Sequence, residues 1–273
     1  MRNLTVFREE TLMAHPKTGR TRISAAEPAA NGAGNRTVQN KILLGLPIRE
    51  RNAILSKLEF FPLPVPMVLN EVAERIKYAY FVNDGLASVL KVMEDGSSVE
   101  VGLCGREGFV GVPLIVGFSS SPTRVIMQVG GSGFRISAKN LAAAMDDCPT
   151  LVASLRRFAQ ELALQSEQIA ACNRLHEVEE RLARWLLMCQ DRLGGNAVPL
   201  THTFLAHMLG TRRASVTEAA GILQKINLIR CSRGLVVIEH RGRLENAACE
   251  CYGVLTRQIA AWHRETNEHE RKR

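Results

Sequence analysis

The strongest constraint on the fold lies in residues 200–228, LTHTFLAHMLGTRRASVTEAAGILQKINL. Apolar side chains recur there in two groups at helical spacing, and Gly210 separates the two groups. Thr201 and Thr211 stand where the hydroxyl caps of two helices are expected. The inward positions are Phe204, Leu205, Met208 and Leu209 in the first group and Val216, Ala220, Leu223 and Ile226 in the second. The stretch therefore predicts two short helices joined by a tight turn, a helix-turn-helix.

The second predicted helix carries arginines and small hydroxyl side chains on its solvent side. An arginine near the start of such a helix can donate two hydrogen bonds to a guanine in the major groove of DNA, and small hydroxyls can reach phosphates or bases. Residues 227–241 follow with apolar runs on both sides of Ser232, Arg233 and Gly234, which predict a β-hairpin wing. The candidate DNA-binding residues are Thr201, Arg212, Arg213, Ser215, Thr217, Arg230 and Arg233.

The distribution of charge agrees with a nucleic-acid partner. Residues 201–273 carry 12 Lys and Arg against 7 Asp and Glu, whereas residues 41–200 carry 17 of each. A positive C-terminal third suits a polyanion, because its cations release condensed counterions from the phosphate backbone. An acidic membrane surface would attract the same charge, but no apolar run approaches a bilayer span and the N-terminus lacks the order of a signal peptide. We therefore expect double-stranded DNA, and no membrane, as a partner.

The seven cysteines are scattered, and their odd count argues against a disulfide framework and favours a reduced, cytoplasmic setting. Cys249 and Cys251 form a C-x-C pair for which the sequence offers no second ligand pair nearby. Packing by small apolar thiols is therefore expected there, and we predict neither a metal nor a cofactor.

Residues 59–136 consist of short β-rich runs separated by glycines, such as RIKYAYFV, SVEVGLC and RVIMQV. Turn sequences such as Asn83-Asp84-Gly85 lie between them, so residues 39–148 are expected to form a small antiparallel roll of the jelly-roll type. Four glycines crowd one segment, namely Gly102, Gly105, Gly108 and Gly111. Glycines let a backbone approach a ligand closely, but glycines at the corners of a roll need no ligand.

A long helix is expected over residues 149–173. Its inward positions advance in alternating steps of four and three residues, which is the pattern of a coiled-coil seam. The seam consists of Leu151, Leu155, Phe158, Leu162, Gln165, Ile169 and Cys172. We expect this seam to form the interface of a parallel homodimer. The alternative is packing against the chain's own roll, and one helix could do both.

The whole chain therefore predicts an α+β architecture: an N-terminal antiparallel β-roll (a double-stranded β-helix), a long dimerisation helix and a C-terminal winged helix-turn-helix. Residues 1–38 are expected to be a disordered leader, and residues 40–58 suit two short helices broken at Pro47. Residues 174–245 contain a hinge helix, the helix-turn-helix and the wing. Residues 246–273 are expected to form a last helix and a solvated charged tail.

With this order of elements, residues 40–245 resemble the Crp/Fnr family of bacterial transcription regulators. The most specific matches are CNRLHEVEERLARWLL in the hinge and LTHTFLAHMLGTRRASVTEAAGILQKINLI in the reading head. The resemblance implies a homodimer that senses a small signal in its roll, binds a pseudo-palindromic site and contacts RNA polymerase. It also implies that Arg213 reads a base and that Thr201 contacts phosphate. Ala214 and Glu218 depart from the cyclic-AMP-binding members, so a different half-site is expected.

The roll departs further from those members. They resemble one another in a Gly-Glu-apolar step, whose glutamate binds the ribose hydroxyl, and in a later arginine that pairs with the cyclic phosphate. Val112 stands where the glutamate would, and Arg124 stands close to the place of the arginine. An unpaired buried hydroxyl costs about 1 to 3 kcal/mol, so we expect no tight binding of cyclic AMP and an unidentified effector. The candidate pocket consists of Gly108, Gly111, Val112, Pro113, Thr123 and Arg124.

Enzymatic activity is not expected, because no nucleophile with a base, no phosphate-binding loop and no metal-spaced cluster stands out. The favoured function is sequence-specific regulation of transcription. The alternative is a protein-interaction or scaffold module that keeps the winged fold without reading DNA.

Overall fold

The computed structural model describes residues 37–271, so the leader predicted at residues 1–38 lies almost entirely outside the described part. Two four-stranded antiparallel sheets form the predicted roll, and they confirm that expectation. One sheet has the strand order β1-β8-β3-β6, with β1 (Glu59–Leu63), β3 (Tyr78–Val82), β6 (Phe109–Val110) and β8 (Gly131–Ser137). The other has the order β2-β7-β4-β5, with β2 (Met67–Asn70), β4 (Leu86–Val92), β5 (Ser98–Cys104) and β7 (Arg124–Val129).

Short helices flank the roll. They are α1 (Lys41–Gly45), α2 (Ile48–Leu55), the 3-10 helix η2 (Val112–Val116) and α3 (Ala138–Asp147). The first two are separated at Pro47, as predicted. The buried Asn40 caps α1, and its side-chain amide donates to the carbonyl oxygens of Val82 at 2.9 Å and Gly108 at 2.8 Å. These bonds fix the first helix to the roll.

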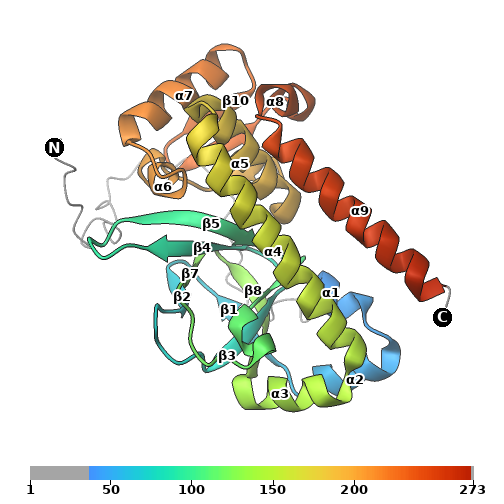
Figure 1. Cartoon of the computed structure of the whole chain (residues 1–273). Helices are drawn as coiled ribbons and strands as arrows, with labels where there is room; N and C mark the ends of the chain where they lie inside the picture. Colours follow the sequence, from blue (N-terminus) through green and yellow to red (C-terminus); the bar gives the residue numbers. More distant parts are fainter. Residues whose placement is uncertain (1–36, 272–273) are drawn as a thin grey trace, which may run out of the picture.

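The long helix α4 (Pro149–Leu175) crosses the molecule between the roll and the C-terminal elements (Figure 1). Its heptad seam is buried within its own chain: Leu151, Leu155, Phe158, Gln165, Ile169 and Cys172 are each at most 5% exposed. A side chain that is already buried in one chain adds no contact area to a dimer. The expectation that these residues face a partner helix is therefore wrong, and the alternative of packing within the chain holds. The remaining member, Leu162, is half-buried against Gly102 of β5.

Two of the crowded glycines explain how α4 can lie so close to the roll. A Cβ atom on Gly108 would stand 2.1 Å from the ring of Phe158, and one on Gly102 would stand 2.6 Å from Leu162 Cδ1. The ring of Phe158 also packs against Phe109, with 5.8 Å between the ring centroids. These glycines therefore make room for side chains of α4.

The C-terminal part begins with α5 (Val178–Leu193). Glu177 and Glu180 form a capping box at its start, and Gly194 closes it with φ +74°. The other elements are α6 (His202–Met208), α7 (Arg213–Lys225), α8 (Arg241–Ala247) and a β10-β11-β9 sheet of β9 (Ala197–Val198), β10 (Ile229–Ser232) and β11 (Leu235–Ile238).

The last helix, α9 (Cys251–Arg271), runs beside α4 (Figure 1). His263 Nε2 of α9 lies 2.7 Å from Glu161 Oε1 of α4, which ties the two helices together. The helix continues through residues 267–271, so most of the sequence expected as a charged tail is helical. None of the helices in the described part of the chain combines the length and apolar character needed to cross a membrane.

A buried polar network joins the roll to α5. Glu100 of β5 is 2% exposed, and its carboxyl group lies 2.7 Å from Trp185 Nε1 of α5 and 2.7 Å from Ser88 Oγ. Burial raises the pKa of Glu100 to about 7, although the hydrogen bonds from Ser88 and Trp185 oppose this shift. The hydroxyl of Ser88 contacts both Glu100 Oε2 and Gln128 Oε1, but it has one proton and can donate to only one of them. A protonated Glu100 can donate to Ser88, and Ser88 can then donate to Gln128. The neutral acid therefore suits this contact.

We predict that stability decreases as the pH rises through the pKa of Glu100. Its folded pKa of about 7 exceeds the ordinary value of 4.5, so the stabilisation is complete below pH 4.5 and is lost as the pH rises through 7. The loss should be roughly 3 kcal/mol, and Glu100→Gln should remove most of this pH dependence. Urea unfolding between pH 5 and about pH 8.5 measures it. Glu94→Gln, at an exposed position, is the control; equal slopes in all three proteins would contradict the prediction.

Candidate nucleic-acid interface

The helix-turn-helix forms where the sequence predicts it. The hydroxyl of Thr201 accepts a hydrogen bond from the backbone N–H of Phe204 at 3.2 Å and so caps α6. Gly210 follows the helix with φ +56°, a conformation that favours glycine. A Cβ atom at this position would also stand 2.9 Å from Val99 Cγ2 of β5. The turn is thus held tightly between the two helices and the roll.

One face of α7 is buried and holds the helix in place, as predicted. Val216, Ala219, Ala220 and Leu223 are its buried residues. Two details differ from the expectation. Arg212, and not Thr211, occupies the cap position, where no side chain accepts a hydrogen bond. Ile226 is 45% exposed, because α7 ends at Lys225 and the chain turns there toward β10.

The candidate reading residues lie at the start of α7. Arg212 and Arg213 are exposed, Thr217 is exposed one turn later, and Ser215 between them is half-buried. The hydroxyl of Thr217 donates to the carbonyl oxygen of Arg213 at 3.0 Å. Two guanidinium groups therefore stand at the free end of a helix whose opposite face is fixed in the core, which is the arrangement that a major-groove reading helix requires.

The predicted wing is the antiparallel hairpin of β10 and β11, with Ser232 paired to Leu235 at its tip. Gly234 there has φ +75°, and Arg233 beside it is exposed. Arg230 is not a free cation, because its Nε atom lies 2.7 Å from Glu239 Oε1 on the neighbouring strand. Of the two wing arginines, Arg233 is thus the better placed for a phosphate.

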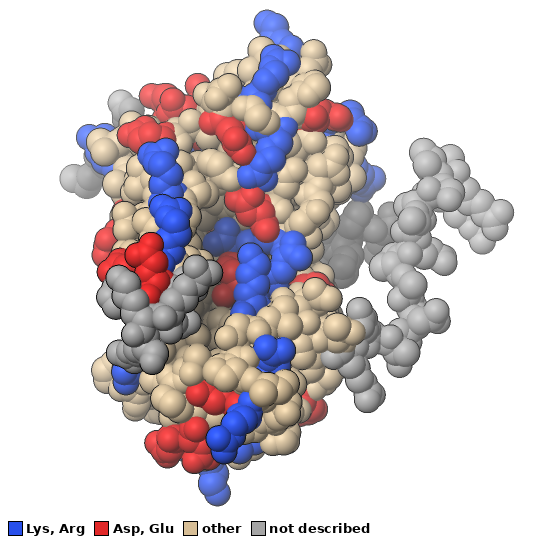
Figure 2. All heavy atoms as spheres, turned by 90° about the vertical axis from the view of Figure 1, so that its right-hand side faces the viewer, with Lys and Arg blue, Asp and Glu red and all other residues tan. Residues whose placement is uncertain are grey.

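Charge alone does not mark the interface. On the face of the molecule that carries α9, basic side chains lie among acidic ones (Figure 2). The positions of Arg212 and Arg213 on α7, rather than a gathering of charge on that face, identify the candidate surface.

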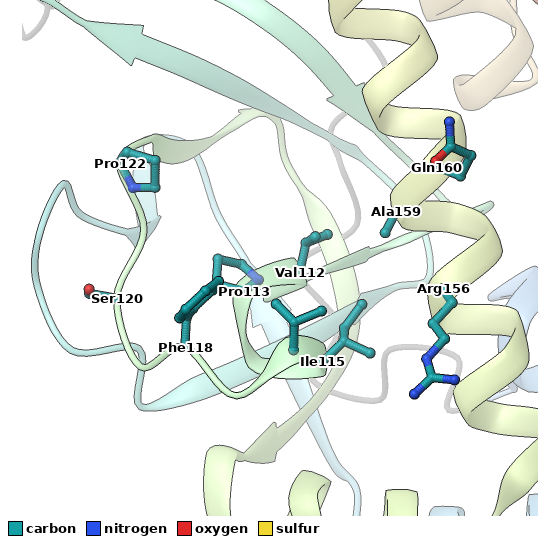
Figure 3. A pocket seen from close by; sticks show the side chains of 10 residues that line it. Val112, Pro113, Ile115, Phe118, Ser120, Pro122, Arg156, Ala159 and Gln160 are labelled. Atoms are coloured by element: carbon teal, nitrogen blue, oxygen red, sulfur yellow. The ribbon is translucent and has the colours of Figure 1, made fainter.

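A cavity of about 500 Å³ lies between η2, the loop that follows it and α4 (Figure 3). Val112 and Pro113 line it, as predicted, whereas Gly108, Gly111, Thr123 and Arg124 do not. Sequence reasoning missed the other lining residues, which are Ile115, Val116, Phe118, Ser120, Pro122, Arg156, Ala159 and Gln160. The lining is mostly apolar, with Arg156 as its charged side chain. Three of these residues belong to α4, so an occupant would touch the long helix directly.

Arg124 has another role than the one expected. Its Nε atom lies 2.9 Å from both carboxylate oxygens of Glu71, and this contact contributes to lowering the pKa of Glu71 against the effect of burial. The ion pair joins β7 to the residue that follows β2. The arginine therefore neutralises a carboxylate of its own chain.

Four possible metal ligands meet at the junction of α4 and α9, namely Cys172, His176, Cys249 and Cys251. In the sequence, Cys249 and Cys251 are a pair without a second pair nearby, but the fold brings Cys172 and His176 beside them. The signal in the sequence was a C-x-x-x-H step and a C-x-C step, separated by more than seventy residues. Nothing local indicates that two such distant steps converge.

Comparison with known proteins supports the same domain. Residues 180–247 match the family model of the Crp-like helix-turn-helix domain, and no curated protein sequence matches the chain.

Three solved structures have a similar fold. FixK2 from Bradyrhizobium japonicum has a TM-score of 0.61 at 17% identity, over 70% of this chain and 98% of that one. The c-di-GMP responsive global regulator CLP of Xanthomonas campestris has a TM-score of 0.60 at 16% identity, over 71% and 100%. A regulator described as a member of the Crp/Fnr family, from Eubacterium rectale, has a TM-score of 0.59 at 16% identity, over 76% and 97%.

The chain has the fold of a Crp/Fnr-type transcription regulator. The resemblance read from residues 40–245 is thereby confirmed, with the Crp-like domain placed on the hinge helix, the helix-turn-helix, the wing and α8. Within this Crp/Fnr fold, the roll of the present chain offers neither the glutamate nor the free arginine that the resemblance associates with cyclic nucleotides.

We predict that cyclic AMP does not bind tightly. Val112 cannot accept a hydrogen bond from a ribose hydroxyl, and Arg124 is paired with Glu71. The unpaired hydroxyl alone costs about 1 to 3 kcal/mol. Titration calorimetry with cyclic AMP should show no heat of binding at micromolar concentrations of the nucleotide. A dissociation constant in the micromolar range or below would contradict this account of the roll.

Proposed function

We propose that this protein is a homodimeric transcription regulator of the Crp/Fnr type, which reads a pseudo-palindromic DNA site with α7 of each protomer. The exposed pair Arg212 and Arg213 at the start of α7 carries the proposal. Arginine can bind the O6 and N7 atoms of guanine together, and Arg213 is the residue that the resemblance assigns to base reading. Thr201, Ser215, Thr217 and Arg233 are the further residues that we propose to contact phosphate or base edges around it.

A protein-interaction module is the less favoured alternative. Such a module would not need two exposed guanidinium groups at the end of the second helix, and the match to the Crp-like domain includes this helix. A regulator of this kind needs no catalytic group. It would act in the cytoplasm, where bacterial DNA lies, and RNA polymerase is the further partner that the resemblance suggests.

The exposed face of α4 is the proposed dimer interface. Its exposed positions also advance in steps of three and four residues, so they form one stripe along the helix. The stripe consists of Gln160, Ala163, Glu167, Ala170 and Arg174. Two alanines in the middle let a second helix approach closely. This stripe replaces the buried seam as the surface that faces the partner.

The cavity beside α4 offers a route from signal to DNA. Arg156 and Gln160 line the cavity, and Gln160 also belongs to the exposed stripe. An effector that fits one position of α4 better than another would shift the population of dimer geometries. The two reading helices would then move closer to, or farther from, the spacing of the half-sites, which is about 34 Å.

We predict that Arg213→Ala weakens binding to a duplex enriched by selection from a random DNA pool about 10- to 100-fold. The loss reflects about 1 to 3 kcal/mol for a bidentate contact to one base pair, and discrimination at that pair should disappear. Fluorescence anisotropy at two salt concentrations measures the effect. Arg257→Ala, which removes an exposed charge from α9, is the matched control and should retain the preference. Unchanged discrimination by Arg213→Ala would exclude this residue as the base reader.

We predict that the double substitution Ala163→Glu and Ala170→Glu produces monomers. Two glutamates in each protomer would place four like charges and extra bulk between the helices. Sedimentation equilibrium of wild type and variant gives the mass directly. Ala153→Glu, at a half-buried position near the start of α4, tests whether any added charge on the helix has the same effect. A double variant that remains dimeric would show that the partner binds elsewhere.

A further inference from the structure

The cysteine-histidine cluster lies where three segments meet. Cys172 is in the last turn of α4, and His176 follows directly after that helix. Cys249 lies between α8 and α9, and Cys251 is the first residue of α9. The four ligand atoms all lie within 4.8 Å of one another. The Sγ atoms of Cys172 and Cys249 are 3.5 Å apart, and Cys251 Sγ is 3.5 Å from His176 Nδ1.

The two separations of 3.5 Å suit one tetrahedral metal ion. Zinc binds thiolate sulfur at about 2.3 Å and imidazole nitrogen at about 2.0 to 2.1 Å, so ligands at the corners of a tetrahedron stand about 3.5 to 3.8 Å apart. An iron–sulfur cluster, which contains several iron and sulfide ions, needs ligand atoms that stand farther apart than these. Three sulfurs and one imidazole form a common ligand set of structural zinc sites.

The hydrogen bonds around the cluster orient its ligands. His176 Nε2 lies 3.0 Å from Glu250 Oε2, and a carboxylate there favours the tautomer that carries its proton on Nε2. The lone pair of Nδ1 then faces the sulfurs. A carboxylate behind a metal-binding histidine is the usual arrangement in zinc sites. Gln168 Nε2 adds a hydrogen bond to Cys251 Sγ at 3.0 Å, which stabilises a negative sulfur.

Two buried cations lie beside the cluster. Arg184 is 2% exposed and Arg181 is 6% exposed, and within residues 37–271 neither forms an ion pair with a carboxylate at contact distance. Arg184 is close enough to act electrostatically on Cys172 of the cluster and, on its other side, on Glu100. Burial lowers the pKa of Arg181, and the sulfurs of Cys172 and Cys249 oppose that shift, so these sulfurs are close enough to act on it. Buried charge is costly unless it is compensated. Three thiolates around one Zn²⁺ carry a net charge of −1, which would add compensation for these two cations.

We propose that Cys172, His176, Cys249 and Cys251 bind one Zn²⁺ ion, which fastens the start of α9 to the hinge between α4 and α5. Each thiol that binds the ion releases its proton to the solvent, and the histidine binds in its neutral form. The ion would thus fix the direction in which the Crp-like domain leaves the long helix. The test of this zinc site does not depend on the proposed function, because the bound metal is measured in the absence of DNA.

Metal analysis of the untagged full-length protein, purified without chelator, tests the site. We expect about one zinc per chain by mass spectrometry of the metals. After removal of zinc, addition of Co²⁺ alone should give the intense visible absorption of a tetrahedral thiolate site. Cys172→Ser and Cys249→Ser should lose both signals, whereas Cys231→Ser, in the wing, should retain them. Glu250→Ala should keep the ligands but weaken zinc binding about 10- to 100-fold.

The wild-type cobalt spectrum keeps the test independent of whether the serine variants fold. Wild-type protein that contains no zinc and gives only the weak absorption of octahedral Co²⁺ would overturn the proposal. Zinc that persists in both serine variants would place the ion elsewhere and would overturn it too. A disulfide between Cys172 and Cys249 in protein purified under reducing conditions would likewise exclude the metal site.

Discussion

The structure depends on the burial of one face of α4 within its own chain. Phe158 occupies the space that Gly108 leaves open, and Gln165 accepts a hydrogen bond from the backbone of β5. Packing of this kind transmits displacement, because close-packed interiors have few voids to absorb it. A displacement of the roll would therefore be transmitted to the helix. The end of the same helix reaches the hinge of the reading domain, where Cys172 and His176 meet the start of α9.

A second contact, between Glu100 and Trp185, joins the roll to α5 without passing through α4. The Crp-like domain is thus held at several places, among them this polar contact, the close approach of Gly210 to Val99, the ion pair of Arg192 with Glu107 and the cysteine cluster. In the proposed mechanism, a signal in the cavity beside α4 would act on the Crp-like domain through this helix. The angle between the two reading helices of a dimer would be the quantity that such a signal changes.

Local sequence patterns predict the helices and strands, but they do not predict which parts of the chain pack against them. Thr201, Gly210 and the apolar face of α7 define the helix-turn-helix within thirty residues, so the sequence predicts it well. The seam from Leu151 to Cys172 marks a buried face but does not say what covers it, because the chain's own roll and a second helix require the same spacing. Arg124 illustrates the same limit, since its partner Glu71 is 53 residues away. The convergence of Cys172 with Cys249, 77 residues apart, likewise follows only from the fold.

The central claim is that two reading helices, held apart by α4 and its partner, enter neighbouring major grooves at the same time. Methylation interference on a bound duplex tests it most directly, because a methyl group on guanine N7 blocks an arginine in the major groove. The account predicts two clusters of interfering guanines on one face of the DNA, separated by about one helical turn of roughly 34 Å. A single cluster, or interference confined to the minor groove, would contradict it.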